Sequence, residues 1–290
     1  MTSARLAQLI GKHKLFGDRR ITIEPERVYY AGTTAQQGIL SELKILEQHG
    51  RLALIAGQER YQFSAIAVTA LSDATPVVAT AAGHVLNTGD QIALAGANAT
   101  LNRRWIVTKV DADTFSLDDS TAQGTGLTAT AYHSLFAACD IKFIRKLSPN
   151  AGRLDPITPE QAEDDRERYG DDDQSTVDEV NKYYVVIDEP LIVGVRGIPS
   201  EAILTEVLYY RRALPSEALS ASINPIIPAQ YDELLRRGTL YHLLDQMDEP
   251  GLEEMTENAF LKYEKEKARV ANIVGMSRLV KPSGTGHLKW

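Results

Sequence analysis

Hydrophobic residues recur every three or four positions near both ends of the chain, a spacing that is typical of amphipathic helices. Early in the sequence, Leu6, Leu9 and Ile10 follow the capping pair Thr2 and Ser3. The later segments keep the same period over longer stretches. The pattern predicts a short first helix and three longer helices, over Thr34–Gln48, Pro228–Met247 and Leu252–Val274.

Between these helices the period changes to two. From about Val68 to Tyr132, short runs such as PVVAT, QIALAG and RWIVTKV alternate apolar and polar positions, and helical periodicity is absent. Turn signals rich in Gly, Asn and Asp separate the runs about every ten residues, as in small barrels and sandwiches. This segment therefore predicts a small all-β module.

Strand patterns also flank the module. RLALIAGQERYQFS, at residues 51–64, is apolar on both sides of Gly57 and Gln58 and predicts a hairpin. Further strands are expected in CDIKFIRKL, KYYVVID and EAILTEVLYYRRA, with an acidic loop at residues 157–179. Beyond Val274, Gly275 and Pro282 are expected to prevent the last helix from continuing.

These patterns together predict an α+β protein. We expect a helical-bundle core with a hairpin and strand region, an inserted small all-β barrel and an extended C-terminal tail. The predicted division is 1–66 for the first part of the core, 67–134 for the barrel, 135–274 for the rest of the core, and 275–290 for the tail. An insertion directly after a hairpin costs a fold little, so the core can be discontinuous in sequence.

Charge and composition narrow the classes of function. The formal net charge is −8, whereas a protein that holds nucleic acid through its phosphates usually carries a basic excess. The single cysteine, Cys139, excludes an intrachain disulfide and a Cys-rich metal site, and it is expected to be a small buried residue in a strand. No apolar stretch approaches the ~20 residues of a membrane span, so no membrane anchor is expected.

The stretch VVATAAGHVLNTGDQIALAG, from Val77 to Gly96, contains the first candidate chemistry. His84 and Asp90 could begin an active site, but Gly89 and Asp90 form a typical turn pair. A histidine just before a turn most often caps or packs, and the sequence offers only His133 as a distant partner. We therefore favour a structural role for His84.

The acidic run does not complete a metal site. Asp171, Asp173 and Ser175 match positions one, three and five of a calcium loop, but Thr176 and Lys182 stand where Gly and Glu are required. The chain also lacks a G-x-S-x-G elbow, a Walker loop and an HExxH helix. We predict no catalytic residue, no metal and no cofactor, and hence no enzyme activity.

The central β segment resembles a small barrel module first described in the ubiquitin-activating enzyme and frequent in phage virion proteins. The matching blocks are VVATAAGHVLNTGD, GANATLNRRWIVTKV and VDADTFSLDD, in the family's order. The family usually has His-Gly where this chain has GHVL, which affects the local turn. The resemblance implies a barrel used for contacts. The residues that fall in place are His84, Gly89, Asp90, Leu101, Asn102, Thr114, Phe115 and Leu117.

The rest of the chain resembles the head-to-tail adaptor, or connector, proteins of tailed phages. Four blocks match in order: LALIAGQERYQFS, LDPITPEQ, YYRRA and IPAQYDELLRRGTL. Ala213 replaces the family's usual proline, and the first 35 residues do not show the usual opening. The resemblance implies that residues 1–66 and 135–274 form an adaptor core.

The adaptor resemblance implies a structural virion protein at the head–tail junction, made in the host cytoplasm. Family members form a homo-oligomeric ring, commonly twelvefold, which docks under the portal protein and joins it to a tail nozzle or tube protein, and possibly to tail fibres. DNA passes through the ring during ejection without sequence-specific binding. Two alternatives remain open: a baseplate or fibre-attachment protein, and a virion-associated cell-wall hydrolase.

Two sets of residues are candidates for contacts in such an assembly. The tail combines large apolar and basic side chains, which suits a segment that becomes ordered on a partner. Its expected portal contacts are Met276, Arg278, Leu279, Lys281, Leu288, Lys289 and Trp290. Basic pairs usually mark a solvated flank, but in a ring they can also bridge subunits or meet the tail. These pairs are Arg211 with Arg212 and Arg236 with Arg237.

Overall fold

The computed structural model describes residues 1–12, 23–147, 152–169, 180–186, 191–197, 199–247 and 251–279. The chain divides into two compact units. One, the helical unit, comprises Met1–Leu46 and Arg212–Trp290, and the other, the β unit, is Glu47–Arg211. The predicted α+β class and closed barrel are confirmed. In this division, the strands outside the barrel share a unit with it.

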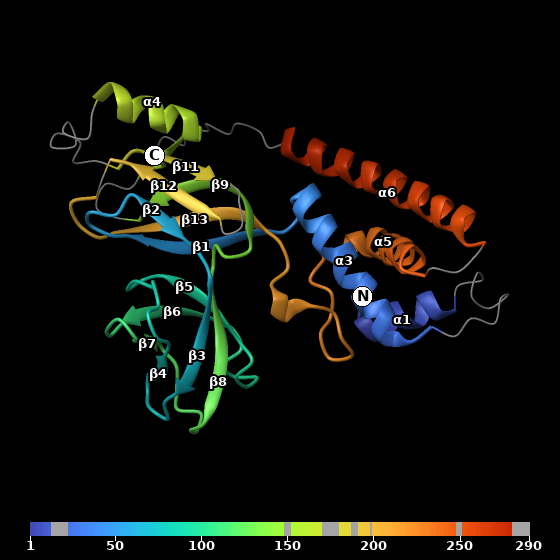
Figure 1. The fold of residues 1–290 in the computed structure, drawn as a ribbon, viewed down its shortest axis with the longest axis horizontal. Helices are drawn as coiled ribbons and strands as arrows, with labels where there is room; N and C mark the ends of the chain where they lie inside the picture. Colours follow the sequence, from blue (N-terminus) through green and yellow to red (C-terminus); the bar gives the residue numbers. More distant parts are fainter. Residues whose placement is uncertain are drawn as a thin grey trace, which may run out of the picture. The chain divides into compact units, whose positions relative to one another are not determined.

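Four helices of the helical unit pack around one apolar cluster (Figure 1). They are α1 (Ser3–Gly11), α3 (Pro25–Leu43), α5 (Asp232–Asp245) and α6 (Glu253–Leu279). Two short 3-10 turns, η2 (Pro215–Glu217) and η3 (Ala229–Tyr231), precede α5. No helix in the described ranges is long and apolar enough to cross a membrane. Fully buried members of the cluster include Leu6, Ile10, Ile39, Leu40, Leu234 and Leu235.

The second helix begins nine residues earlier than predicted and ends earlier too. Pro25 occupies the first turn, where its missing N–H costs nothing, and Val28 and Ala31 extend the buried stripe toward it. Lys44, with φ of 51°, ends the helix in the left-handed region. The prediction of Thr34–Gln48 was wrong at both ends because apolar Leu46 just precedes a strand.

The last helix passes through Gly275 and ends at Leu279, so the predicted end at Val274 was wrong. One glycine inside a helix costs about 1 kcal/mol relative to alanine, which a helix of 27 residues tolerates. Pro282, which cannot continue a helix, lies outside the described residues.

Two small sheets share an apolar cluster in the β unit. The first is antiparallel, with β13 (Ile203–Arg211) between β1 (Glu47–Leu54) and β9 (Ala138–Lys146). The second has the order β10 (Asp155–Pro156), β11 (Lys182–Val186), β12 (Ile192–Arg196) and β2 (Arg60–Gln62). The sequence pattern did not predict β12.

The predicted hairpin at residues 51–64 is wrong in its pairing. Its turn exists, but β1 pairs with β13 and β2 pairs with β12. The Tyr61 hydroxyl accepts the N–H of Ile55 at 2.8 Å and donates to the carbonyl oxygen of Gln58 at 3.0 Å, which closes the turn. Gly57, with φ of 78°, supplies the left-handed residue there.

The first part of the expected acidic loop is a helix, α4 (Pro159–Tyr169). Thr158 and Gln161 form a capping box: the Thr158 hydroxyl oxygen accepts the N–H of Gln161 at 3.2 Å, and the Gln161 side chain accepts the N–H of Thr158 at 3.0 Å. Pro159 fits the first turn. These local signals were sufficient to predict the helix, and the acidic composition obscured them.

The barrel closes through six strands in the order β3, β4, β7, β6, β5, β8, with β8 paired back to β3 (Figure 1). Alternate residues point inward, as the period of two predicted; in β5, Ile92 and Leu94 are buried. The strands are β3 (Ala65–Leu71), β4 (Val77–Thr80), β5 (Gln91–Ala95), β6 (Arg104–Lys109), β7 (Thr114–Leu117) and β8 (Leu127–His133).

Candidate functional site

Asp90 ties the barrel to the first sheet. It follows Gly89, whose φ is 95°, and it is 2 % exposed. Its Oδ1 accepts the N–H of Ala53 in β1 at 2.7 Å, and its Oδ2 accepts the N–H of Asn87 at 2.8 Å. A carboxylate can be buried when hydrogen-bond donors such as these N–H groups replace the water molecules that it loses. Both oxygens of Asp90 are therefore used to hold two chain segments together.

His133, and not His84, is the histidine beside Asp90. Strand β5 pairs with β8 so that Ile92, two residues after Asp90, lies opposite His133. The Nδ1 of His133 accepts the N–H of Leu135 at 3.1 Å, so its neutral ring carries the proton on Nε2, which lies 3.6 Å from Asp90 Oδ1. Local sequence patterns did not indicate that His133 and Asp90 lie side by side, because strand pairing brings them together.

His84 is buried inside the barrel, as expected for a packing residue. The rings of His84 and Phe115 are nearly perpendicular, with centroids 5.1 Å apart at 85°. Neither ring nitrogen has a hydrogen-bond partner within the part of the chain that the structure describes. The interpretation of His84 as a packed ring is confirmed.

The cavity beside Asp90 is small. It measures about 30 Å³ and is lined by residues that include Tyr61, Asp90 and His133. This volume holds about one water molecule, whereas ligand sites usually measure about 300–1,000 Å³. Burial raises the pKa of Tyr61 to about 12, against the hydrogen bond from Ile55 and with help from the negative charge of Asp90. Tyr61 thus stays protonated and keeps its donor hydrogen bond.

The other candidate nucleophile and metal-ligating residues either make structural contacts or lie outside the described residues. Cys139 is a buried residue of β9, as predicted, and its Sγ lies 3.4 Å from the carbonyl oxygen of Tyr210. Among the described residues, no cluster of three or more His, Cys, Asp or Glu could hold a metal. Lys182 begins β11, while Asp171, Asp173, Ser175 and Thr176 lie outside the described residues.

Trp105 and the first basic pair, Arg211 with Arg212, lie in or beside strands. Trp105 is 5 % exposed in the barrel, and the guanidinium of Arg103 lies over its ring at 3.9 Å, so Trp105 is a core residue. Arg211 ends β13 and is 8 % exposed, and Arg212 follows it. Within a single chain, Arg211 presents little surface to a partner.

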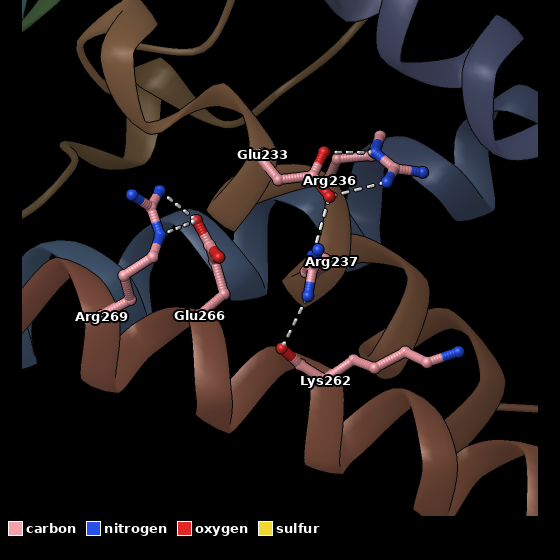
Figure 2. Close-up of polar contacts among 6 residues, drawn as sticks. All are labelled: Glu233, Arg236, Arg237, Lys262, Glu266 and Arg269. Atoms are coloured by element: carbon pink, nitrogen blue, oxygen red, sulfur yellow. Dashed lines mark hydrogen bonds and ion pairs between the residues drawn. The ribbon is translucent and has the colours of Figure 1, made fainter.

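The remaining pair, Arg236 and Arg237, is held on α5 by one carboxylate (Figure 2). Arg236 donates from Nε and Nη2 to the two oxygens of Glu233, each at 2.8 Å. Arg237 donates from Nε to Glu233 at 2.7 Å and from Nη1 to the carbonyl oxygen of Lys262 on α6 at 3.3 Å. The spacing Glu-x-x-Arg-Arg, which sequence reasoning overlooked, indicates these one-turn pairs.

Replacing Glu233 with Gln is expected to lower the free energy of unfolding by about 0.5–1 kcal/mol at neutral pH, because the group is partly exposed. The hydrogen bond from Arg236 does most to lower the pKa of Glu233 to about 2 from 4.5. A lowered carboxylate pKa stabilises the fold above the unfolded value and stops doing so as the pH falls through the folded value. The difference between wild type and variant should therefore shrink between pH 4.5 and about 2.

Urea unfolding at several pH values measures this difference. Glu257→Gln, an exposed change on α6, is the matched control and should alter stability by less than about 0.5 kcal/mol. A Glu233→Gln deficit that stays constant down to pH 2.5 would contradict the assignment.

The predicted portal contacts fall at the end of α6 and beyond it. Met276, Arg278 and Leu279 belong to the last turns of the helix, where the prediction had placed an extended tail. Lys281, Leu288, Lys289 and Trp290 lie outside the described residues. The structure therefore leaves their role in binding as a prediction.

No protein-family model matches this chain, and no curated protein matches it. The buried carboxylate of Asp90 in the β unit is used in structural contacts, and two hollows of about 540 and 580 Å³ lie beside α5 and α6.

Proposed function

We propose that this chain is a structural virion protein, the adaptor whose ring docks under the portal and joins it to the tail. In this role the protein acts through its interfaces and through the channel they enclose. It needs neither a catalytic residue nor a cofactor. The DNA would pass through the ring without being held by its sequence.

The observation that carries the proposal is the structural role of the four sequence blocks that resemble adaptor proteins. Leu52–Ser64 contains the turn that sends β1 and β2 to different sheets, and Leu154–Gln161 contains β10 and the capping box of α4. Tyr209–Ala213 ends β13 where the helical unit begins, and Ile227–Leu240 builds η3 and most of α5. Three of the blocks shape connections between elements and the fourth builds most of a helix, so each block has a structural role, which supports a shared frame over a chance match.

The charge of the chain also suits this role. A subunit with net charge −8 gives a channel wall that repels phosphate, so DNA can slide without being gripped. Asp90 and Ser120, two buried polar residues of the inserted barrel, accept backbone N–H groups, which suits a structural module. Met276 and the residues after it would contact the portal.

The test is assembly with the portal protein of the same virion. We expect the purified full chain to cosediment with portal rings and to appear in electron micrographs as a second, coaxial ring with a central channel. Binding to tail fibres but not to portals would favour the baseplate alternative. Hydrolysis of peptidoglycan by the purified chain would favour the cell-wall hydrolase, and either result would contradict the adaptor proposal.

A further inference from the structure

One side of the α5–α6 pair bears a hollow of about 540 Å³ with a positive rim. Its lining includes apolar Leu240, Met255 and Ala259, and Glu233 binds both of its arginines (Figure 2). The rim therefore keeps a local positive excess in a chain of net charge −8. We call this surface the basic flank: Arg236, Arg237, Leu240, Met255, Asn258 and Lys262.

A second and more open hollow, of about 580 Å³, carries the opposite charge. Its lining includes three carboxylates and an aromatic pair, Tyr241 and Phe260, whose ring centroids are 5.3 Å apart. Phe260 is 40 % exposed, so its ring contributes apolar surface to this hollow. We call this surface the acidic flank: Tyr241, Asp245, Glu253, Glu257 and Phe260.

The two flanks lie on nearly opposite sides of α6. Each uses four α6 residues with the spacing i, i+3, i+4, i+7, and the two sets are offset by two residues. At about 100° per residue, an offset of two residues is a rotation of about 200°, so the two sets lie about 160° apart around the helix axis. The sets are Met255, Asn258, Ala259 and Lys262 for the basic flank, and Glu253, Thr256, Glu257 and Phe260 for the acidic flank.

We propose that neighbouring copies of this chain join with the basic flank of one copy against the acidic flank of the next. This inference rests on the proposed ring and names the surfaces that would build it. A contact between two different surfaces of one chain is heterologous, and it repeats until a ring closes or a filament grows. Surfaces on opposite sides of one helix suit such repetition, because each copy then has a neighbour on either side.

The chemistry of the two flanks favours a second copy as the occupant. An apolar centre inside a charged rim is the usual anatomy of a protein interface. Met255 and Leu240 on one flank would meet Tyr241 and Phe260 on the other, while the cations face carboxylates. Exposed charges are screened over about 10 Å at 0.1 M salt, so assembly should weaken as salt rises.

Charge reversal on each flank tests the contact in the full chain. The acidic-flank variant is Asp245→Lys with Glu257→Lys, and the basic-flank variant is Asn258→Glu with Lys262→Glu. Asp245, Glu257 and Asn258 are exposed, and the Lys262 carbonyl that accepts Arg237 remains after substitution. The helices and the hydrogen bonds between Glu233 and the two arginines should therefore persist in both variants.

Each variant alone should lose assembly, with subunit affinity weaker by about tenfold or more, because like charges then face each other. Equal amounts of the two variants should assemble again. In an alternating ring, every contact pairs either two native flanks or two reversed flanks, and both pairs attract. Sedimentation velocity and electron microscopy, with and without portal rings, measure the assembly. Recovery on mixing cannot arise from a variant that merely fails to fold.

Matched controls carry the same charge changes at exposed positions outside both flanks. They are Glu24→Lys with Glu254→Lys, and Lys265→Glu with Asn272→Glu. Both controls should assemble as the wild type does. Equal loss in the controls would mean that assembly responds to total charge, and would overturn the interface.

The remaining outcomes separate the interface from the ring. If the wild type and both variants form rings equally well, the proposed interface is overturned and the adaptor proposal still stands. Loss in each variant without recovery on mixing would also overturn the interface. A wild-type chain that stays monomeric, alone and on portal rings, would overturn both. A basic-flank variant that loses portal binding but still self-assembles would assign that flank to the portal and contradict the proposal.

Discussion

Replacing Asp90 with Ala is expected to lower the free energy of unfolding of the β unit by about 3–5 kcal/mol. The substitution removes the acceptor for the N–H groups of Ala53 and Asn87, and the side chain sits in a site that is 2 % exposed. Each buried donor that is left unsatisfied costs about 1–3 kcal/mol. Asp90→Asn keeps one acceptor oxygen and should lose about half as much.

Urea unfolding followed by the fluorescence of Trp105, a buried residue of the barrel, measures the loss. The experiment uses Trp290→Phe as the background, so that one tryptophan reports. Asp113→Ala is the matched control, since its carboxylate also accepts a turn N–H, that of Gly83 at 2.8 Å, but at an exposed position. The control should lose less than about 1 kcal/mol. Equal losses in the two variants would contradict the assigned role of Asp90.

Replacing Gly194 with Ala is expected to destabilise the same unit by about 2–3 kcal/mol. Gly194 in β12 lies opposite Tyr184 in β11, and a Cβ at Gly194 would meet Tyr184 Cζ at 2.0 Å. The ring cannot easily move aside, because it is 4 % exposed and its hydroxyl accepts the Nε–H of Arg60 at 3.1 Å. Glycine is therefore required there for the ring to lie against the strand.

Two further substitutions show whether the cost is steric. Gly38→Ala in α3 adds a methyl group to open space inside a helix and should stabilise the protein by up to about 1 kcal/mol. In a Tyr184→Ala background, Gly194→Ala should cost less than about 1 kcal/mol, since the clashing ring is absent. If Gly194→Ala is as costly without the ring as with it, backbone conformation and not the ring explains the effect.

Local signals in the sequence were enough for the barrel and for the approximate positions of the first helix and α5. Alternation of period two, interrupted by glycine turns, identifies strands because the pleat puts successive side chains on opposite faces. The cap at Thr2 is confirmed, with its hydroxyl accepting the N–H of Arg5 at 3.1 Å. The capping box at Thr158 and Gln161 was equally local, so α4 could have been predicted.

The tertiary structure alone decided which segments meet. β1 and β2 read as a hairpin because they are adjacent in sequence, yet β1 pairs with β13, which is more than a hundred residues away. Strand pairing also brings Asp90 close to Ala53 and His133. The two oppositely charged hollows beside α5 and α6 form only when the two helices pack. The period of hydrophobic residues shows which side of a helix or strand is buried, but many other segments could cover that side equally well. The choice among them depends on the packing and hydrogen bonds of residues that are distant in sequence.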